Sequence, residues 1–222
     1  MISDTDRQQA FRYMGYTDES IPENIKAITD KCEKRLLDAV KPSYSYRIFD
    51  IEKCDNGIYL CGSNFIMLGN DIKNHLDGCC KAALICATLG VGADRLIKQL
   101  SVSDMTESFV TDALASAIIE QVCDIAEEEI KQKLPDMFMT WRFSPGYGDF
   151  PIGQQRDFLS VTNAPKLTGI HLSESDMLIP AKSVTAVIGL SENPVKQKKR
   201  GCTTCNMKDR CSFRKRGVRC EF

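Results

Sequence analysis

Apolar residues at helical spacing predict a long helix in the middle of the chain. Within residues 109–134 they recur every three or four positions, as Val110, Leu114, Ala117, Ile118, Val122 and Ile125. This spacing places them on one face of a helix, and Pro135 ends the pattern. Similar reasoning predicts shorter helices over residues 6–15, which end at a glycine, and over residues 22–40, which stop before Pro42.

Strand signals are distributed between the helical segments. Aromatic and β-branched residues or apolar runs predict strands at 44–50, 57–68, 169–172 and 183–190. The turn Asp55-Asn56-Gly57 separates the first two. The apolar run 82–89 is expected to be buried, but its periodicity does not distinguish strand from helix. Another helix is expected to begin within 71–76. Helices and strands mix without regular βαβ alternation, so we expect an α+β fold rather than α/β.

Composition narrows the class of protein. The chain has 222 residues, of which 43% are hydrophobic and 27% charged, as expected for one substantial globular core. The longest apolar run, 82–89, is too short to cross a bilayer, and residues 1–7 lack the pattern of a secretion signal. We therefore expect a cytoplasmic protein without a membrane partner.

Charge divides the chain into two regions. The formal net charge is −1, but residues 194–222 contain ten Lys or Arg against Asp209 and Glu221. Residues 1–193 are therefore acidic, and we predict two units, a main domain over 1–193 and a basic tail over 194–222.

Two short motifs have a structural interpretation as well as a functional one. Cys79-Cys80 suggests redox chemistry, but cysteines of this kind are more often buried as small apolar residues. Gly90-Val91-Gly92-Ala93 before a helical pattern suggests a phosphate-binding loop. A third glycine and an acidic ribose partner are missing, so dinucleotide binding is disfavoured.

The most specific sequence feature extends over about 45 residues after the long predicted helix. It begins with Arg142 and the turn Pro145-Gly146-Tyr147, continues with Thr168-Gly169 and Leu172-Ser-Glu-Ser175, and ends with Pro180 and Ser183-Val184. The pattern resembles the activation domain of cobalamin-dependent methionine synthase, in which an arginine, a Pro-Gly-Tyr turn and two later blocks follow one another at this spacing.

The resemblance implies a function and a fold. It implies an α+β domain with a twisted antiparallel sheet and flanking helices, which binds S-adenosylmethionine. It also implies a stand-alone activation protein that supports reductive methylation of cob(II)alamin on a partner, a cobalamin-dependent methionine synthase or another corrinoid protein. Such a protein is an accessory component of a methyltransferase reaction, with no catalytic residue of its own. The cobalamin would be bound only by the partner, and a flavodoxin or ferredoxin would supply the electron.

The same resemblance indicates which residues would bind the methyl donor, S-adenosylmethionine. Arg142 suits the carboxylate of S-adenosylmethionine, since a guanidinium makes two parallel charge-assisted bonds. Pro145 and Gly146 would turn the backbone beside the ligand, and Tyr147 offers a ring and a hydroxyl. Alignment of the family's long helix places its ligand glutamate on Glu120. Without the resemblance, Glu120 would be assigned to a solvated helix face and Arg142 to a surface salt bridge.

The chain departs from the family pattern at several places. A histidine that the family often has after the tyrosine is absent from 148–153, and a later tyrosine has no counterpart. The cobalt-ligating motif Asp-x-His-x-x-Gly of the neighbouring cobalamin domain is also absent from the sequence.

The basic tail contains a second group of candidate functional residues, four cysteines. Cys202, Cys205, Cys211 and Cys220 place four thiols within nineteen residues, the number of ligands required by a 4Fe-4S cluster or by tetrahedral zinc. An iron–sulfur cluster would link electron supply to methyl donation. Zinc and unmetallated thiols remain alternatives from ligand type alone.

Two other functions fit parts of the sequence. The chain could be a docking subunit that caps a corrinoid protein without using S-adenosylmethionine. The basic runs 196–200 and 214–219 could instead contact nucleic acid around a zinc knuckle, although Phe213 is the only aromatic residue between them and stacking would be poorly provided.

Overall fold

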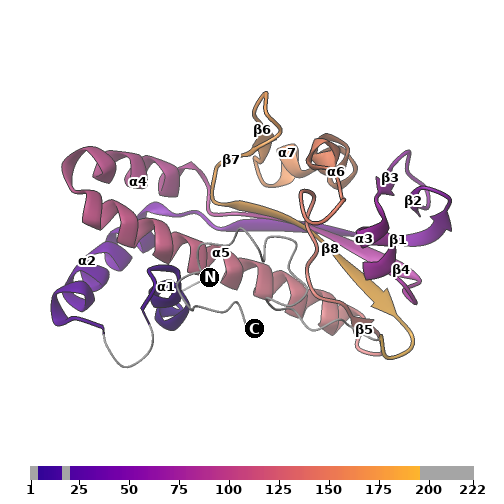
Figure 1. Ribbon diagram of the computed structural model, residues 1–222, viewed down its shortest axis with the longest axis horizontal. Helices are drawn as coiled ribbons and strands as arrows, with labels where there is room; N and C mark the ends of the chain where they lie inside the picture. Colours follow the sequence, from indigo (N-terminus) through magenta and orange to yellow (C-terminus); the bar gives the residue numbers. More distant parts are fainter. Residues whose placement is uncertain (1–4, 17–20, 196–222) are drawn as a thin grey trace.

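An antiparallel sheet of six strands forms the centre of the structure, a computed structural model that describes residues 5–16 and 21–195. The strand order is β3-β2-β1-β4-β8-β5, and the long strands run across the whole molecule (Figure 1). The strands are β1 (Ser43–Cys54), β2 (Gly57–Leu60), β3 (Ile66–Leu68), β4 (Lys81–Thr88), β5 (Phe138–Met139) and β8 (Ser183–Ser191). The expected α+β class with an antiparallel sheet is confirmed.

Strand β4 shows why its apolar run was ambiguous in the sequence. It lies between β1 and β8, and seven of its eight residues are buried. Leu84 and Cys86 pack on one face of the sheet, while Ala83 and Ile85 pack on the other. A strand covered on both faces is apolar at every position, so the alternation that identifies a half-exposed strand is lost.

One face of the sheet is covered by the long helix α5 (Met105–Lys133), which runs beneath the strands (Figure 1). Helices α1 (Arg7–Tyr13), α2 (Glu23–Ala39) and α4 (Val91–Ser103) pack with α5 in a shared hydrophobic cluster. The side chain of Asp104 accepts hydrogen bonds from the backbone N–H groups of Thr106 and Glu107, which explains why the helix begins four residues before the predicted boundary.

The predicted apolar stripe of α5 needs one correction. Five of its six members are buried, but Ile125 is 41% exposed. Ala126 and Ile130, which the stripe did not include, are buried against the sheet instead. Because α5 is covered by both the sheet and other helices, its buried surface is wider than a single stripe.

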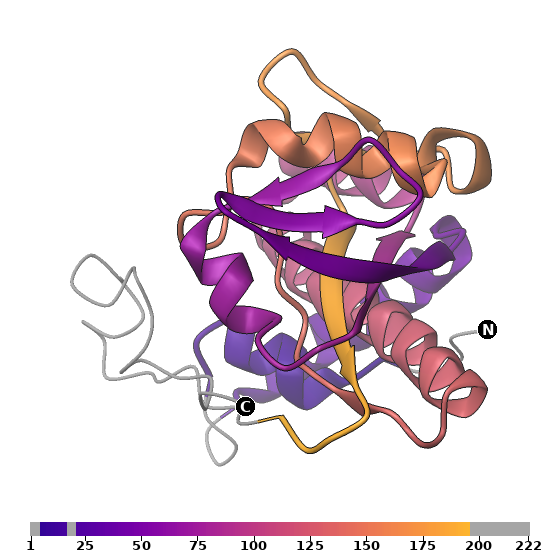
Figure 2. The same ribbon diagram turned by 90° about the vertical axis from the view of Figure 1, so that its right-hand side faces the viewer.

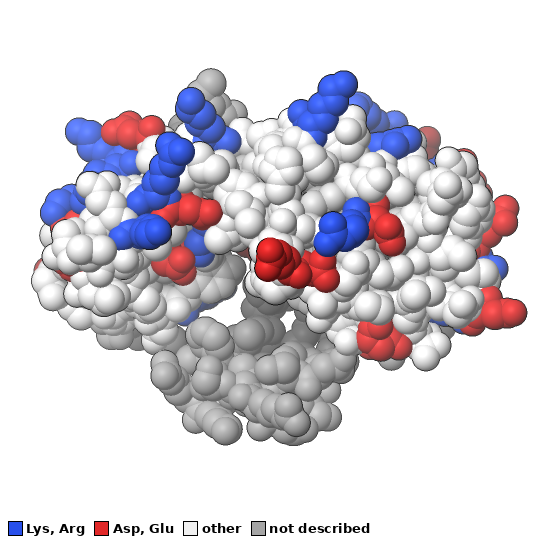
Figure 3. Space-filling model, turned by 90° about the horizontal axis from the view of Figure 1, so that it is seen from above, with Lys and Arg blue, Asp and Glu red and all other residues white. Residues whose placement is uncertain are grey.

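The opposite face of the sheet is covered by shorter elements, of which the sequence pattern predicted only the strand at 169–172. Figure 2 shows them on the far side of the sheet from α5. They comprise η1 (Ile152–Gln154), α6 (Gln155–Thr162), α7 (Ala164–Leu167), and the small ribbon of β6 (His171–Leu172) and β7 (Leu178–Ile179). Phe158 of α6 is fully buried. Basic and acidic side chains are interspersed on this face (Figure 3), which among the described residues carries no continuous basic surface.

The single strand predicted over 57–68 is wrong. The segment forms two strands, β2 and β3, in an antiparallel hairpin in which Ile58 pairs with Met67. Gly62, with φ 76°, provides the turn, since a left-handed backbone favours glycine. The short helix α3 (Asn70–His75) follows, close to its predicted position.

The glycines at 90–93 have a packing role. Gly92 lies so close to α2 that an added Cβ would be 1.9 Å from the carbonyl oxygen of Ala39. Gly90 has φ 75° at the start of α4. The first glycine therefore permits the turn and the second permits close contact between two helices, which explains the motif without a phosphate.

Residues 196–222 lie outside the described residues, and with them the predicted tail and its four cysteines. The division at residues 193 and 194 thus stays a prediction. Within 5–16 and 21–195, no helix is long and apolar enough to cross a membrane. The same residues contain no group of three or more His, Cys, Asp or Glu side chains that would hold a metal ion.

The low pKa of Glu129, a carboxylate on α5, makes part of the stability of the fold depend on pH. Hydrogen bonds from the hydroxyls of Tyr44 and Tyr46, at 2.7 and 2.9 Å, lower the pKa of Glu129 to about 2. Because the folded-state pKa is lowered, this contribution to stability is present above about pH 4.3, the ordinary value, and is lost as the pH falls toward 2. In the Tyr44→Phe/Tyr46→Phe variant the pKa of Glu129 should rise toward its ordinary value. Carboxyl NMR titration measures this, and an unchanged pKa would contradict it.

Candidate ligand-binding site

Arg142 lies at the edge of the sheet, where the backbone fixes the direction of its side chain. The next residue, Phe143, pairs with Val187 of β8 through two backbone hydrogen bonds of 2.9 and 2.8 Å. Phe143 is buried in the hydrophobic cluster on the α6 face. Because successive residues of an extended chain point to opposite faces, Arg142 extends toward α5.

Three carboxylates on α5 surround the guanidinium. Its Nη2 is 3.1 Å from Glu120 Oε2 and 3.0 Å from Asp124 Oδ1, and its Nε is 3.0 Å from Glu127 Oε1. Positions 120, 124 and 127 lie on one face of a helix, and we call them the carboxylate row. Only 14% of the Arg142 side chain is exposed, so these ion pairs are partly shielded from water.

The surroundings keep Arg142 charged. Burial alone would lower the pKa of Arg142, but the nearby Cys123 thiol and the carboxylate row raise it above its ordinary value. Three carboxylates against one guanidinium leave a net negative charge at this place. The site is therefore suited to a ligand that carries positive charge as well as a carboxylate.

The predicted Pro145-Gly146-Tyr147 turn is a tight loop beside this cluster. The N–H of Gly146 donates to the carbonyl of Phe150 at 2.8 Å, and Gly146 has φ 94°. Pro145 is buried, whereas Tyr147 is 53% exposed, with its ring edge directed at Phe143 over 5.8 Å. The loop thus holds an aromatic ring at the surface on a fixed backbone.

The loop is attached to α3 by reciprocal hydrogen bonds. The two carboxylate oxygens of Asp149 accept from the backbone N–H groups of Asn70 and Asp71, at 2.7 and 2.8 Å. In return, the N–H of Asp149 donates to the Asp71 side chain at 3.1 Å. These backbone bonds lower the pKa of Asp149. They satisfy the free N–H groups at the start of α3 in the same way as a helix cap, although residue 149 is distant in sequence.

An aromatic cluster connects the loop to α3. The ring of His75 is 4.6 Å from Trp141 and 5.0 Å from Phe143, centroid to centroid. His75 Nε2 also contacts Thr140 Oγ1 at 2.9 Å. The histidine that the family often has after the tyrosine of this loop is absent from the chain. His75, from a distant part of the sequence, lies near this segment instead. No pattern in the sequence signalled its position.

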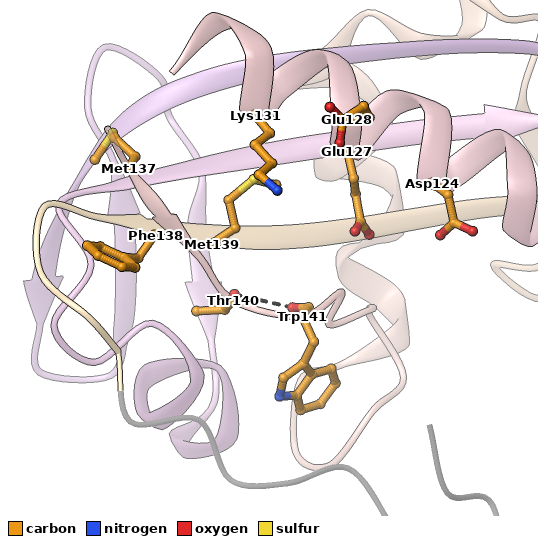
Figure 4. A pocket seen from close by; sticks show the side chains of 9 residues that line it. All are labelled: Asp124, Glu127, Glu128, Lys131, Met137, Phe138, Met139, Thr140 and Trp141. Carbon is orange, nitrogen blue, oxygen red and sulfur yellow. Dashed lines mark hydrogen bonds between the residues drawn. The ribbon is translucent and has the colours of Figure 1, made fainter. Parts of the chain in front are cut away.

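A surface hollow of about 580 Å³ lies next to Arg142. Figure 4 shows Asp124 and Glu127 extending from α5 toward the segment that carries Thr140 and Trp141. The full lining is Asp124, Glu127, Glu128, Lys131, Met137, Phe138, Met139, Thr140 and Trp141. The hollow and the Arg142 cluster share two carboxylates, so a molecule held at Arg142 has open space beside it.

The structure brings most of the predicted site residues together. Arg142 and Glu120 form an ion pair, and Pro145, Gly146 and Tyr147 follow in the adjoining loop. The sequence missed Asp124 and Glu127 as partners of Arg142, although their helical spacing from Glu120 was available as a signal. It also missed Tyr13 of α1, which is close enough to Glu120, Arg142 and Tyr147 for their charges to affect its pKa.

The domain is thus an antiparallel sheet backed by one long helix, with a guanidinium and a row of carboxylates between them. The fold is that of a methionine synthase reactivation domain, as the sequence motifs suggested. The chain is similar to the solved structure "Crystal Structure of the MetH Reactivation Domain bound to AdoHcy", with a TM-score of 0.67 over 96% of this chain and 82% of the other. Sequence identity is 14%. No protein-family model and no curated protein matches the chain.

The four tail cysteines, Cys202, Cys205, Cys211 and Cys220, belong to the part of the chain that the structure does not describe. Their assignment to a 4Fe-4S cluster or zinc stays a prediction from their spacing. Seven other cysteines are free thiols. Among them, burial raises the pKa of Cys79 to about 11, so this thiol is protonated and poorly nucleophilic at neutral pH.

Proposed function

We propose that this chain binds S-adenosylmethionine and supports the reductive methylation of cob(II)alamin on a cobalamin-dependent methionine synthase or a related corrinoid methyltransferase. The observation that carries the proposal is the Arg142–Glu120 pair beside the Pro145-Gly146-Tyr147 loop, in a fold similar to a reactivation domain. The solved domain is described as bound to AdoHcy, the product that remains when S-adenosylmethionine gives up its methyl group.

The charges of the site match the amino-acid end of this donor. A zwitterion can enter an ion pair by placing its carboxylate on the guanidinium and its ammonium on the carboxylate. The Arg142–Glu120 contact of 3.1 Å would then be replaced by two ligand contacts. Asp124 and Glu127 would continue to neutralise Arg142 during this exchange, so no buried charge is left without a partner.

The chain would contribute mainly by positioning. Methyl transfer from a sulfonium requires the donor to be held in line with its acceptor, and fixed orientation alone is worth several kcal/mol of a reaction barrier, roughly 7–11 in favourable cases. Arg142 is fixed by the β8 pairing of Phe143, and Tyr147 by the hydrogen bonds of its loop. The corrinoid and the electron, from a flavodoxin or ferredoxin, would come from partner proteins.

Trp141 makes this proposal testable. It is the only tryptophan in the sequence and lies next to Arg142, so its fluorescence reports on this place alone. We expect S-adenosylmethionine to change this fluorescence saturably and to give a binding isotherm by calorimetry. With a methionine synthase that lacks its own activation domain and an electron donor, the protein should restore methyl transfer from an inactive cob(II)alamin form.

The outcomes distinguish the alternatives. Absence of S-adenosylmethionine binding, alone and with the partner, would overturn the proposal. Formation of a complex with the corrinoid protein without any donor binding would favour a docking subunit. Salt-sensitive retention on RNA would instead favour a nucleic-acid contact by the basic tail.

A further inference from the structure

The guanidinium of Arg142 uses its two edges differently. A planar guanidinium can bind a carboxylate through its Nε–Nη2 edge or through its Nη1–Nη2 edge. On the first edge, Glu127 Oε1 lies 3.0 Å from Nε and Asp124 Oδ1 lies 3.0 Å from Nη2. On the second edge, Nη1 donates to the backbone carbonyl of Glu120 at 3.4 Å, which is long for a hydrogen bond. The carboxylate of a ligand would therefore displace least at the Nη1–Nη2 edge.

The three members of the carboxylate row consequently differ in how a bound ligand would affect them. Glu120 and Asp124 both contact Nη2, the nitrogen that belongs to both edges, at 3.1 and 3.0 Å. A carboxylate on the Nη1–Nη2 edge would compete with them for the N–H groups of Nη2. Glu127 contacts Nε, which that edge does not include. Glu127 can therefore keep its bond to Arg142 while the ligand is bound.

Glu127 is also the most shielded member of the row. Its side chain is 30% exposed, against 43% for Glu120 and 64% for Asp124. Figure 4 shows it extending from α5 toward the segment that contains Trp141, the residue before Arg142. A charge-assisted hydrogen bond is stronger where water has less access to it. Because the Nε–H bond lies in the plane of the guanidinium, this contact fixes the orientation of that plane.

We propose that Glu127 is a positioning residue, which holds Arg142 through Nε and so presents the Nη1–Nη2 edge to the carboxylate of S-adenosylmethionine. The inference rests on the proposed function and assigns Glu127 a role that Glu120 and Asp124 do not share. A role through charge alone would have the opposite effect. An anion beside Arg142 repels the ligand's carboxylate, so removal of the charge of Glu127 would then favour binding of that carboxylate.

Two variants of the full chain separate the contact from the charge. Glu127→Asp keeps the charge but withdraws the carboxylate by one carbon–carbon bond, about 1.5 Å, and so breaks the contact with Nε. Glu127→Gln removes the charge but keeps an oxygen that accepts from Nε. Asp112→Ala is the matched control, because it breaks a different ion pair between α5 and a shielded cation. That cation is Lys182, at 2.9 Å from Asp112 and with 15% of its side chain exposed.

The measured quantity is the preference for S-adenosylmethionine over its decarboxylated form, which keeps the sulfonium and the amine. Calorimetry gives this preference as the ratio of the two dissociation constants, and thermal unfolding checks that each variant is folded. We expect Glu127→Asp to lower the preference about five- to tenfold, with Glu127→Gln within about threefold of the wild type and Asp112→Ala within about twofold.

Two results would overturn the inference while leaving the proposed function intact, because the wild type would still bind the donor. One is an unchanged preference in Glu127→Asp, and the other is an equal loss of preference in Asp112→Ala. A wild-type protein that binds neither ligand, alone or with the corrinoid partner, would overturn both the inference and the proposed function.

Discussion

Replacement of Arg142 by alanine should weaken binding of S-adenosylmethionine by at least about 100-fold and abolish reactivation at ordinary donor concentrations. The guanidinium can make two charge-assisted bonds to a carboxylate, and each such bond contributes roughly 1.5–3 kcal/mol. Its loss would also leave the carboxylate row without a cation, and Glu120, Asp124 and Glu127 would repel the ligand's carboxylate. Calorimetry and the reactivation assay measure the two effects.

The control is Arg156→Ala. Arg156 also pairs with an acid, Asp176 at 3.5 Å, but its side chain is 72% exposed. That variant should bind the donor normally, because an exposed pair contributes little. Arg142→Ala should remain folded with a stability loss of about 1–3 kcal/mol. Reactivation equal to wild type by this variant would reject the site assignment.

Replacement of Gly92 by alanine should destabilise the fold by about 2–4 kcal/mol. In an open helix this substitution would be favourable by up to about 1 kcal/mol, since alanine is the better helix former. At Gly92 the new Cβ would be 1.9 Å from the carbonyl oxygen of Ala39 and 2.9 Å from its carbonyl carbon. Both are backbone atoms, so α2 and α4 would have to move apart.

Gly153→Ala provides the matched comparison. Its Cβ would meet only Asp176 Oδ2, at 3.8 Å, which is an ordinary contact. Chemical denaturation of both variants should place Gly153→Ala within about 0.5 kcal/mol of the wild type. Equal stability of the two variants would show that α2 and α4 can separate without cost.

Elements with a repeating apolar pattern could be predicted from the sequence, whereas short elements and contacts between distant residues could not. Helices α1, α2 and α5 were visible because their apolar residues follow a helical period and are bounded by Gly15, Pro42 and Pro135. Strand β4 was ambiguous because it is buried on both faces. Helices α6 and α7 are too short to show a helical period. The turn at Gly62 divides into β2 and β3 a segment whose aromatic and β-branched residues indicate a single strand.

Some residues of the candidate site could likewise be predicted from the sequence, and others could not. Arg142 and the Pro145-Gly146-Tyr147 turn are contiguous, so the resemblance to a known family located them. Their pairing with Glu120 depended on an alignment, and the structure brings the two side chains within 3.1 Å. His75 and Tyr13 lie far from the motif in sequence. Only the packing of α3 and α1 brings them near it, and no local pattern encodes such proximity.

The hydrogen bonds between Asp149 and α3 also affect the order in which segments of the protein fold. The first turn of α3 takes its cap from a residue 78 positions later in the chain. During synthesis Asn70 and Asp71 leave the ribosome long before residue 149 exists, and contacts between distant residues form late. The helix and the loop that carries Tyr147 therefore reach their final form together, after the central strands β1 and β4 are available. A nascent chain that stops before residue 149 has neither.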